Sequence, residues 1–259
     1  MKLSTSMTRA MLLALGGLAA YAQETNACKD LPSQADLRTA LVTAQAQKNG
    51  GLGFHMWATL VNRDGVVCAV AFSGADRGDQ WPGSRVISAQ KANTANSFSL
   101  PGFALSTANL YTAVQPGGTL FGLQDSNPVN TLVGYDGKSE DIGTDKDPMV
   151  GKKVGGINVF GGGLALYAQQ GGKILGGVGV SGDTSCADHN IAWKVRDLLA
   201  LDRVPAGVAG TGRDNIIYDL AVDTVTRATS SPSGYGHPVC SADATSIGNN
   251  LPALFPTGL

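Results

Sequence analysis

The chain has 259 residues, with 19 lysines and arginines against 20 aspartates and glutamates. This near-neutral balance lacks the basic face by which proteins bind nucleic acids, so we expect no nucleic-acid partner. Hydrophobic residues make up 43% of the chain, which is enough for the packed core of one domain.

The first 22 residues have the pattern of a cleavable secretory signal peptide. Lys2 and Arg9 flank the start of an apolar core at 10–19, and the sequence A-Y-A at 20–22 provides the cleavage site. That core is shorter than the ~20 residues that span a bilayer, and no later segment is apolar enough to span one. We therefore expect an exported protein, periplasmic or secreted, with no membrane span. Cleavage removes two basic residues and no acidic one, which leaves a net charge near −3.

An exported chain has its cysteines where disulfides form. Four cysteines follow the predicted cleavage site: Cys28, Cys68, Cys186 and Cys240. They allow three pairings, among which we favour Cys28 with Cys68 and Cys186 with Cys240. The alternative is a zinc site, because His189 lies three residues after Cys186 and His237 lies three before Cys240.

The N-terminal half of the mature chain alternates between helical and β-rich patterns. An apolar stripe after Ser33, a good N-cap residue, predicts a helix over residues 31–49. Two β-rich runs, 54–61 and 66–72, flank an Asp-Gly turn and predict a hairpin. Two further helices are expected over 84–99 and, shorter, over 106–114.

Beyond residue 115 the pattern is first irregular and then returns to strands. Mixed charges without periodicity over 136–153 predict a solvated loop, with a cation-binding loop as the alternative. A last clear helix over 186–201 has Asp183 or Thr184 as its cap. Three strands are expected in between, over 156–160, 164–169 and 173–180.

Meander strands followed by helices predict the α+β class with an antiparallel sheet. We expect one domain over 23–204, with an insertion at about 101–153. Residues 205–259 form an irregular C-terminal extension in this interpretation, with 214–222 as a candidate edge strand and Cys240 as the main anchor.

Gly177, Gly179 and Gly182 match the spacing of a dinucleotide-binding loop, and Asp202 follows 20 residues after the last of them. The context argues against such a loop, because the preceding strands are joined by tight hairpins and not by helical crossovers. Gly177 and Gly179 instead alternate along one strand, where they leave one face open to a packed helix or to a flat ligand. Helix packing is the favoured interpretation.

Three segments also resemble a known family. They are V-N-R-D-G at 61–65, K-A-N-T-A at 91–95, and G-G-G-L-A-L-Y at 161–167 followed by G-K-I-L-G-G-V-G-V-S-G at 172–182 and Asp188. These resemble the GlcG/HbpS family, also known as the haem-degrading or DUF336 domain, over roughly residues 36–201. The resemblance implies a profilin-like α/β/α sandwich with a five-stranded antiparallel sheet, homo-oligomerisation, and binding of haem, which we expect to be haem b.

The chain departs from the family pattern in its signal peptide, its insertion, its cysteines and its C-terminal tail. His189 also stands where a Glu commonly follows the Asp. Members of the family differ in function, and some accompany glycolate or cobalamin metabolism. The ligand and the oligomeric state are therefore the features on which the resemblance is least informative.

Haem requires an apolar surface, an axial ligand and usually cations for its propionates. His55 and His189 are the candidate axial ligands, with a structural hydrogen bond or a capping role as the alternative for each. Asp188 would orient His189, His237 would meet His189 if Cys186 pairs with Cys240, and Arg85 and Lys91 would pair with ligand carboxylates. The expected ligand-binding set is His189, Asp188, Lys91, Gly162, Gly163, Gly177, Gly179, Ser181 and Gly182.

The sequence therefore predicts an exported haem- or tetrapyrrole-binding protein without robust turnover, with haem degradation left open. The alternative is a protein or enzyme of the same fold for a small organic ligand, such as a hydroxy acid or a corrinoid. A serine hydrolase is rejected because Ser181 does not stand in a G-x-S-x-G elbow.

Overall fold

The computed structural model describes residues 27–226 and 229–258, so the predicted signal peptide lies outside the described residues. Within these ranges no helix is long and apolar enough to cross a membrane. The helices are α2 (Gln34–Gln45), α3 (Ser84–Ser97), α4 (Thr131–Gly134), α5 (Ser185–Leu198) and α6 (Ala242–Leu254). The strands are β1 (Trp57–Asn62), β2 (Val67–Phe72), β3 (Gly163–Tyr167), β4 (Ile174–Ser181), β5 (Ala221–Val222) and β6 (Thr229–Ser230).

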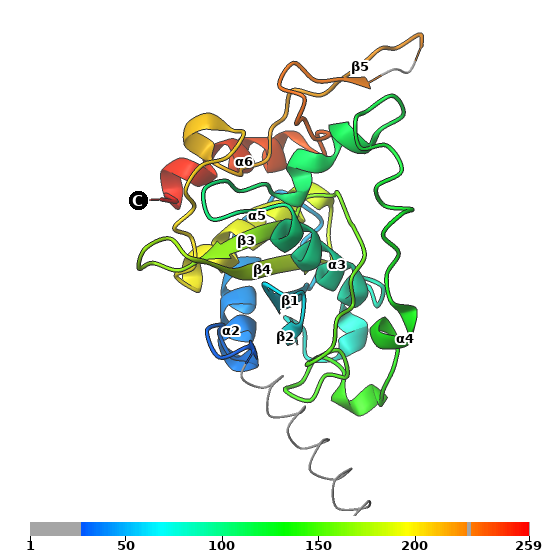
Figure 1. Cartoon of the computed structure of the whole chain (residues 1–259), viewed down its shortest axis with the longest axis vertical. Coiled ribbons are helices and arrows are strands. Elements are labelled where there is room, and N and C mark those ends of the chain that lie inside the picture. Colours follow the sequence, from blue (N-terminus) through cyan, green and yellow to red (C-terminus); the bar gives the residue numbers. More distant parts are fainter. Residues whose placement is uncertain (1–26, 227–228, 259) are drawn as a thin grey trace, which may run out of the picture.

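A four-stranded antiparallel sheet forms the middle layer, in the order β2-β1-β4-β3. Helix α3 packs on one face of this sheet, and α2 and α5 pack on the other (Figure 1). The α+β class and the three-layer, profilin-like arrangement are thus confirmed. The β1–β2 hairpin turns where the sequence predicts it, with Gly65 in the left-handed region at φ +75°.

The sheet has four strands and not five, because the strand expected at residues 156–160 does not form. Its backbone groups bond to side chains in place of a neighbouring strand. The Asn158 N–H donates to Oγ1 of Thr94 at 3.0 Å, and the Phe160 N–H donates to Oδ1 of Asn158 at 3.1 Å. Thr107 Oγ1 donates to the Phe160 carbonyl. The segment therefore crosses the C-terminal end of α3 without joining the sheet, which its apolar composition does not indicate.

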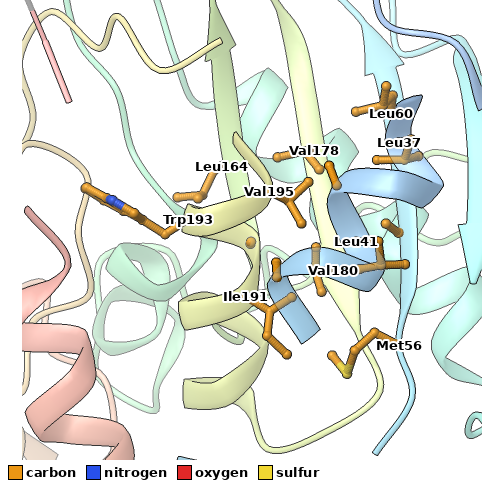
Figure 2. Close-up of a cluster of buried hydrophobic side chains, with 14 of the residues drawn as sticks. Leu37, Leu41, Met56, Leu60, Leu164, Val178, Val180, Ile191, Trp193 and Val195 are labelled. Carbon is orange, nitrogen blue, oxygen red and sulfur yellow. The ribbon is translucent and has the colours of Figure 1, made fainter. Parts of the chain in front are cut away.

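The largest hydrophobic cluster lies between the sheet, α2 and α5 (Figure 2). Leu37 and Leu41 of α2 face Val178 and Val180 of β4, and Ile191 of α5 completes this layer. Each of these side chains is at most 2% exposed, and burying one contributes roughly 1.5–3 kcal/mol. The face of α2 is fixed at its start by the predicted Ser33 cap, whose side chain accepts from the N–H of Asp36 in a capping box.

Helix α3 covers the glycine face of β4. A Cβ built on Gly179 would lie 1.9 Å from the carbonyl oxygen of Ser88, and one on Gly177 would lie 2.4 Å from that of Ala92. The two glycines therefore admit the backbone of a helix, as the packing interpretation predicts. The flat-ligand interpretation of this face is wrong, because α3 already fills it.

Two disulfides join Cys28 to Cys68 and Cys186 to Cys240, which is the pairing favoured from the sequence. The first ties the residues before α2 to β2, and the second ties the start of α5 to the segment before α6. The zinc alternative is wrong, because no cysteine of the described residues is free.

The insertion is anchored more firmly than a solvated loop. Its first part holds two short 3₁₀ turns, Thr107–Leu110 and Thr112–Val114, in place of one helix. Further on, Asp147 is 2% exposed and receives a bidentate pair from Arg85 of α3, with Nε 2.9 Å from Oδ2. Two sequence-based expectations are therefore corrected. The cation that the acidic segment binds is the guanidinium of Arg85, and Arg85 pairs with this protein carboxylate where we expected a ligand carboxylate.

The C-terminal extension is not irregular, because α6 occupies residues 242–254. Ser241 caps it by accepting from the Ala244 N–H at 3.0 Å, and the helix packs on α5, where Trp193 donates its indole N–H to the Phe255 carbonyl. Only Ala221–Val222 of the candidate edge strand is extended, and it pairs with β6 in a separate two-stranded sheet.

Candidate functional site

The family-like segments meet at a buried ion pair between α3 and α5. Nζ of Lys91 lies 2.6 Å from Oδ2 of Asp188 and donates to the Val180 carbonyl at 3.1 Å. Both side chains are at most 3% exposed. Burial raises the pKa of Asp188 to about 6, although Lys91 acts in the opposite direction. The K-A-N-T-A segment and the aspartate after the glycine run therefore form one unit.

Gly162 and Gly163 make room for this pair. Gly162 has φ +117°, and a Cβ there would lie 3.1 Å from Nζ of Lys91 and 3.0 Å from Cβ of Asp188. A Cβ on Gly163 would lie 2.5 Å from the carbonyl oxygen of Lys91. Because the pair and its glycines are enclosed by protein, Lys91 and Asp188 do not present charges to a ligand in this structure.

Ser181 and Gly182 end strand β4 and turn the chain toward α5. Ser181 is buried opposite Trp57 of β1, and a Cβ on Gly182 would lie 2.6 Å from the carbonyl oxygen of His55. Thr184 then caps α5, which decides between the two predicted caps. Gly182 therefore lets the chain pass close behind the His55 segment.

Asp183, the other candidate cap, instead holds the segment that leads to His55. Its carboxylate accepts the backbone N–H groups of Leu52, Gly53 and Phe54 at 2.8, 2.9 and 3.3 Å. Three donors fix the position of a loop that has no secondary structure of its own. The motif region thus positions His55 through backbone contacts, which the sequence alone does not indicate.

His189 is fully buried. Its Nε2 lies 3.1 Å from Oδ1 of Asn215 and 3.2 Å from the backbone nitrogen of Ile216, and its Nδ1 has no partner among the described residues. Burial lowers the pKa of His189 to about 3, so the ring is neutral at ordinary pH. Asp188 bonds to Lys91 and does not orient the His189 ring as we expected.

His237 lies near His189, as predicted from the disulfide that joins their segments. The backbone N–H of Gly161 donates to Nε2 of His237 at 3.3 Å, and a Cβ on Gly161 would lie 3.0 Å from Cβ of His189. Burial lowers the pKa of His237 to about 4. The two buried rings flank one glycine of the family-like run and anchor the C-terminal extension.

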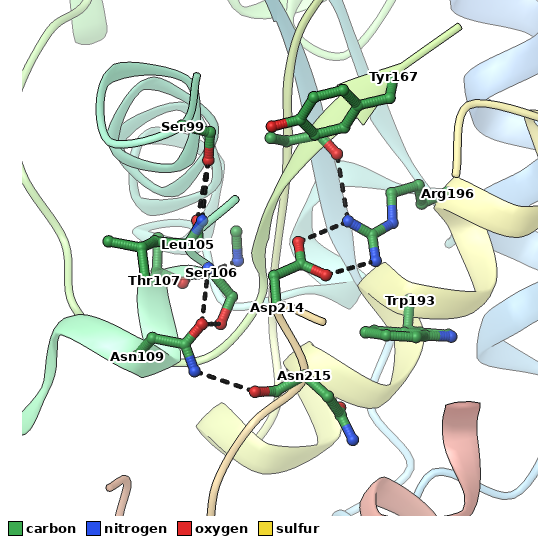
Figure 3. Close-up of polar contacts among 12 residues, drawn as sticks. Ser99, Leu105, Ser106, Thr107, Asn109, Tyr167, Trp193, Arg196, Asp214 and Asn215 are labelled. Atoms are coloured by element: carbon green, nitrogen blue, oxygen red, sulfur yellow. Dashed lines mark hydrogen bonds and ion pairs between the residues drawn. The ribbon is translucent and has the colours of Figure 1, made fainter. Parts of the chain in front are cut away.

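A third buried ion pair, which sequence reasoning missed, lies close to His189 (Figure 3). Arg196 of α5 holds Asp214 with nitrogen–oxygen distances of 2.6 and 2.9 Å, both side chains being fully buried. Next to it, Asn109 of the insertion donates to the Asn215 carbonyl at 2.9 Å. Asp214 and Asn215 therefore join the insertion and the C-terminal extension to α5.

His55, in contrast, is exposed at the surface just before β1. Its Nδ1 lies 3.1 Å from Oγ of Ser73, which also accepts the Met56 N–H at 2.8 Å. In the tautomer that donates from Nδ1 to Ser73, the lone pair of Nε2 is left for a metal ion. The structural hydrogen bond predicted for this residue is thus present, and it is compatible with a ligand role.

Exposed apolar side chains precede His55 in the chain or pack on its neighbour Phe54, and we call this set the His55 face: Leu52, Phe54, His55 and Trp81. Leu52 is 60% exposed, and Phe54 and Trp81 are 40% and 51% exposed although their rings pack together at 5.1 Å. Arg38 of α2 reaches the same side, donating to the carbonyl of Gly74, the residue after Ser73. A cavity of about 460 Å³ lies beside the face, lined by Phe54, Asp183 and residues of α2, α5 and α6.

The His55 face offers an exposed imidazole and apolar surface, and Arg38 adds a cation that bonds next to Ser73. Of the chain's three histidines, only His55 exposes its ring. Within the described residues, no cluster of three or more histidine, cysteine or acidic side chains could hold a metal ion by itself.

Comparison with known proteins confirms the family resemblance predicted from the three sequence segments. The family described as "Haem degrading protein HbpS-like" matches residues 33–196, which is more than half of the chain. No curated protein matches the chain.

Three solved structures are similar to this chain. The Klebsiella pneumoniae protein ORFY, of family DUF336, is 24% identical with a TM-score of 0.44, over 64% of this chain and 88% of that one. A structure described as a PduOC–heme complex is 24% identical with a TM-score of 0.43, over 63% and 89%. A double mutant of Streptomyces reticuli HbpS is 18% identical with a TM-score of 0.41, over 77% and 90%.

Proposed function

The chain belongs to the HbpS-like family, and on that premise we propose that it is an exported haem-binding protein in which His55 ligates the iron of haem b. The observation that carries the proposal is the exposed imidazole of His55 beside the exposed rings of Phe54 and Trp81. Bound haem contributes an iron that accepts an imidazole nitrogen and a planar apolar ring that leaves water.

Residues of the His55 face and their neighbours would then share the binding of haem. Ser73 orients the His55 ring through Nδ1, so that Nε2 faces outward. Phe54 and Trp81 cover the macrocycle, and Asp183 keeps Phe54 in place through its backbone N–H. Arg38, which donates to the carbonyl next to Ser73, would be the cation for a propionate. Of the two candidate axial ligands, the proposal keeps His55, because His189 is enclosed and hydrogen-bonded.

Export, either to the periplasm or outside the cell, is part of the same proposal. Two disulfides support it, because such bonds persist in oxidising compartments, and the N-terminal sequence pattern supports it independently. A role in haem or iron handling follows from the proposed ligand, and a homo-oligomer stays a prediction from the family resemblance.

Haemin titration of the mature chain tests the proposal. We expect a saturable Soret shift for the wild type, and at least roughly tenfold weaker binding for His55→Ala, which corresponds to ~1.4 kcal/mol. His189→Gln is the matched control: it removes the other candidate imidazole and should leave the spectrum unchanged in a folded sample. Equal binding by His55→Ala and the wild type would exclude His55 as the ligand.

The cavity beside Asp183 favours the second candidate, a small organic ligand such as a hydroxy acid or a corrinoid. It lies next to the His55 face, with Lys48 and Asn49 in its lining. A thermal-shift screen separates the two candidates, because a ligand that binds only the native state stabilises it. A hydroxy acid that stabilises the protein while haemin does not would replace the haem proposal.

A further inference from the structure

A second cavity, of about 430 Å³, lies where the insertion meets the N-terminal end of α3. Trp57 of β1 and Val86 of α3 form its floor, and Tyr135 and Ile142 of the insertion form its outer wall. It shares no residue with the His55 face. The family-like core contributes one side of this cavity and the insertion particular to this chain contributes the other.

The insertion is held over α3 by polar contacts that leave the cavity open. Arg85 pairs with Asp147 and donates from Nη1 to the Gly134 carbonyl at 2.9 Å. Asp147 also accepts the Gly143 N–H at 2.7 Å. These contacts fix both ends of the segment that includes Tyr135 and Ile142. The outer wall is therefore built into the fold and does not depend on a chance loop position.

The indole of Trp57, in the floor of the cavity, makes no hydrogen bond among the described residues. The Trp57 side chain is 1% exposed, and its indole nitrogen Nε1 has no acceptor among the described residues. A buried donor without a partner costs about 1–3 kcal/mol. That nitrogen is closed off from the cavity as well as from solvent, so Trp57 offers a ligand only apolar ring surface. The rings and aliphatic groups around it favour an apolar body for the ligand.

The cavity also carries a cation that no carboxylate neutralises among the described residues. Arg77 is exposed at its rim and donates from Nη1 to the Ser139 carbonyl at 3.3 Å. Asp76, also in the lining, already caps a short turn by accepting the Gly78 N–H at 2.7 Å. Arg85 is paired with Asp147, so Arg77 is the cation left for an anionic ligand.

The N-terminus of α3 adds no second site for an anion. The N–H groups of Ser84 and Arg85 already donate to the carbonyls of Trp81 and Pro82, at 2.9 and 3.4 Å. Arg77 therefore points to a ligand with one negative charge.

We propose that this cavity binds a small aromatic monocarboxylate. The carboxylate bonds to Arg77 at the rim, and the ring packs among Val86, Tyr135 and Ile142. The site is separate from the proposed haem site and does not depend on it, because no residue belongs to both.

Calorimetric titration with benzoate tests this proposal, and benzamide, which has nearly the same shape without the charge, is the comparison. We expect saturable binding of benzoate and about tenfold weaker binding of benzamide. Arg77→Gln should weaken benzoate binding about tenfold. Lys138→Gln, which removes an exposed cation of the same insertion outside the cavity, should bind as the wild type does.

Ile142→Ala removes apolar surface from the outer wall of the cavity, so it should weaken benzoate binding about fivefold. Because Arg77 lies at the surface, Arg77→Gln remains a valid test even if Ile142→Ala fails to fold. The proposal is overturned if the wild type gives no saturable binding, if Arg77→Gln binds benzoate as tightly as the wild type, or if Lys138→Gln loses as much affinity. None of these results bears on haem.

Discussion

Replacing Lys91 by Met removes one partner of a buried ion pair and leaves the other in place. Asp188 would keep only the Asp183 N–H, 2.9 Å from its Oδ1, as a partner for its charge. Breaking a pair this deeply buried costs about 3–5 kcal/mol at neutral pH. The Met side chain replaces the aliphatic stem of Lys91, so most of this loss comes from the unpaired carboxylate.

The loss should depend on pH in a direction that the structure sets. Lys91 lowers the pKa of Asp188, which is already about 6 in the wild type because of burial, so the variant has a still higher pKa. The folded variant then binds a proton more tightly than the folded wild type does. The extra instability is therefore constant below about pH 5 and grows above pH 6, by up to ~1.4 kcal/mol per pH unit.

Urea unfolding of both proteins at about pH 5 and pH 8 measures this effect. The double variant Lys91→Met, Asp188→Leu should lose less stability at pH 8 than the single Lys91 variant does, because no buried charge remains. Equal losses at the two pH values, or a double variant as unstable as the sum of its single variants, would refute the reasoning about this pair.

Three further outcomes test other parts of the structure. Gly179→Ala should cost about 3 kcal/mol in thermal or urea unfolding, because its Cβ would meet α3, while Gly102→Ala, with open space around it, should change stability by less than about 0.5 kcal/mol. The pKa of His189 is about 3 in the folded state and near 6.5 in the unfolded state, so the unfolded state takes up the proton first and the free energy of unfolding falls as pH falls through that window. His189→Gln should therefore flatten the acid side of the stability curve, and an unchanged slope would contradict the burial of His189. Cys240→Ser, which opens the disulfide to Cys186, should cost about 2–4 kcal/mol in an oxidised sample and nothing in a reduced one.

Local signals account for the parts of the fold that the sequence predicts well. The Ser33 cap and the Gly65 turn depend on residues next to them, and both lie where expected. The alternation of Gly177 and Gly179 likewise indicates a face with close backbone approach. Local pattern leaves open what occupies such a face, and only the position of α3 decides that it is a helix.

The errors come from contacts between residues far apart in the chain. Residues 156–160 have strand composition, but their backbone groups bond to Thr94 and Thr107, which no local pattern reveals. The Arg85–Asp147 pair joins residues 62 apart. Helix α6 is different, because Ser241 is a recognisable cap and only the Gly, Ser and Pro content nearby obscured it.

The candidate site shows the same division. The resemblance identifies Lys91, Asp188 and the glycines as a unit, and the structure brings them together. Sequence cannot tell which histidine is exposed, because the exposure of His55 and the burial of His189 depend on Asp183 and Asn215 contacts across the fold. The choice between His55 and His189 as the iron ligand thus depended on the burial of each side chain, which the local sequence does not indicate.

Imidazole rescue tests the role of His55 most directly. His55→Gly removes the ring and leaves space for free imidazole in its place. We predict that this variant lacks the Soret maximum of the wild-type haem complex, and that added imidazole restores it. His189→Gly should keep the wild-type maximum without imidazole. A His55→Gly complex with the wild-type spectrum before any addition would contradict the assignment of His55 as the haem ligand.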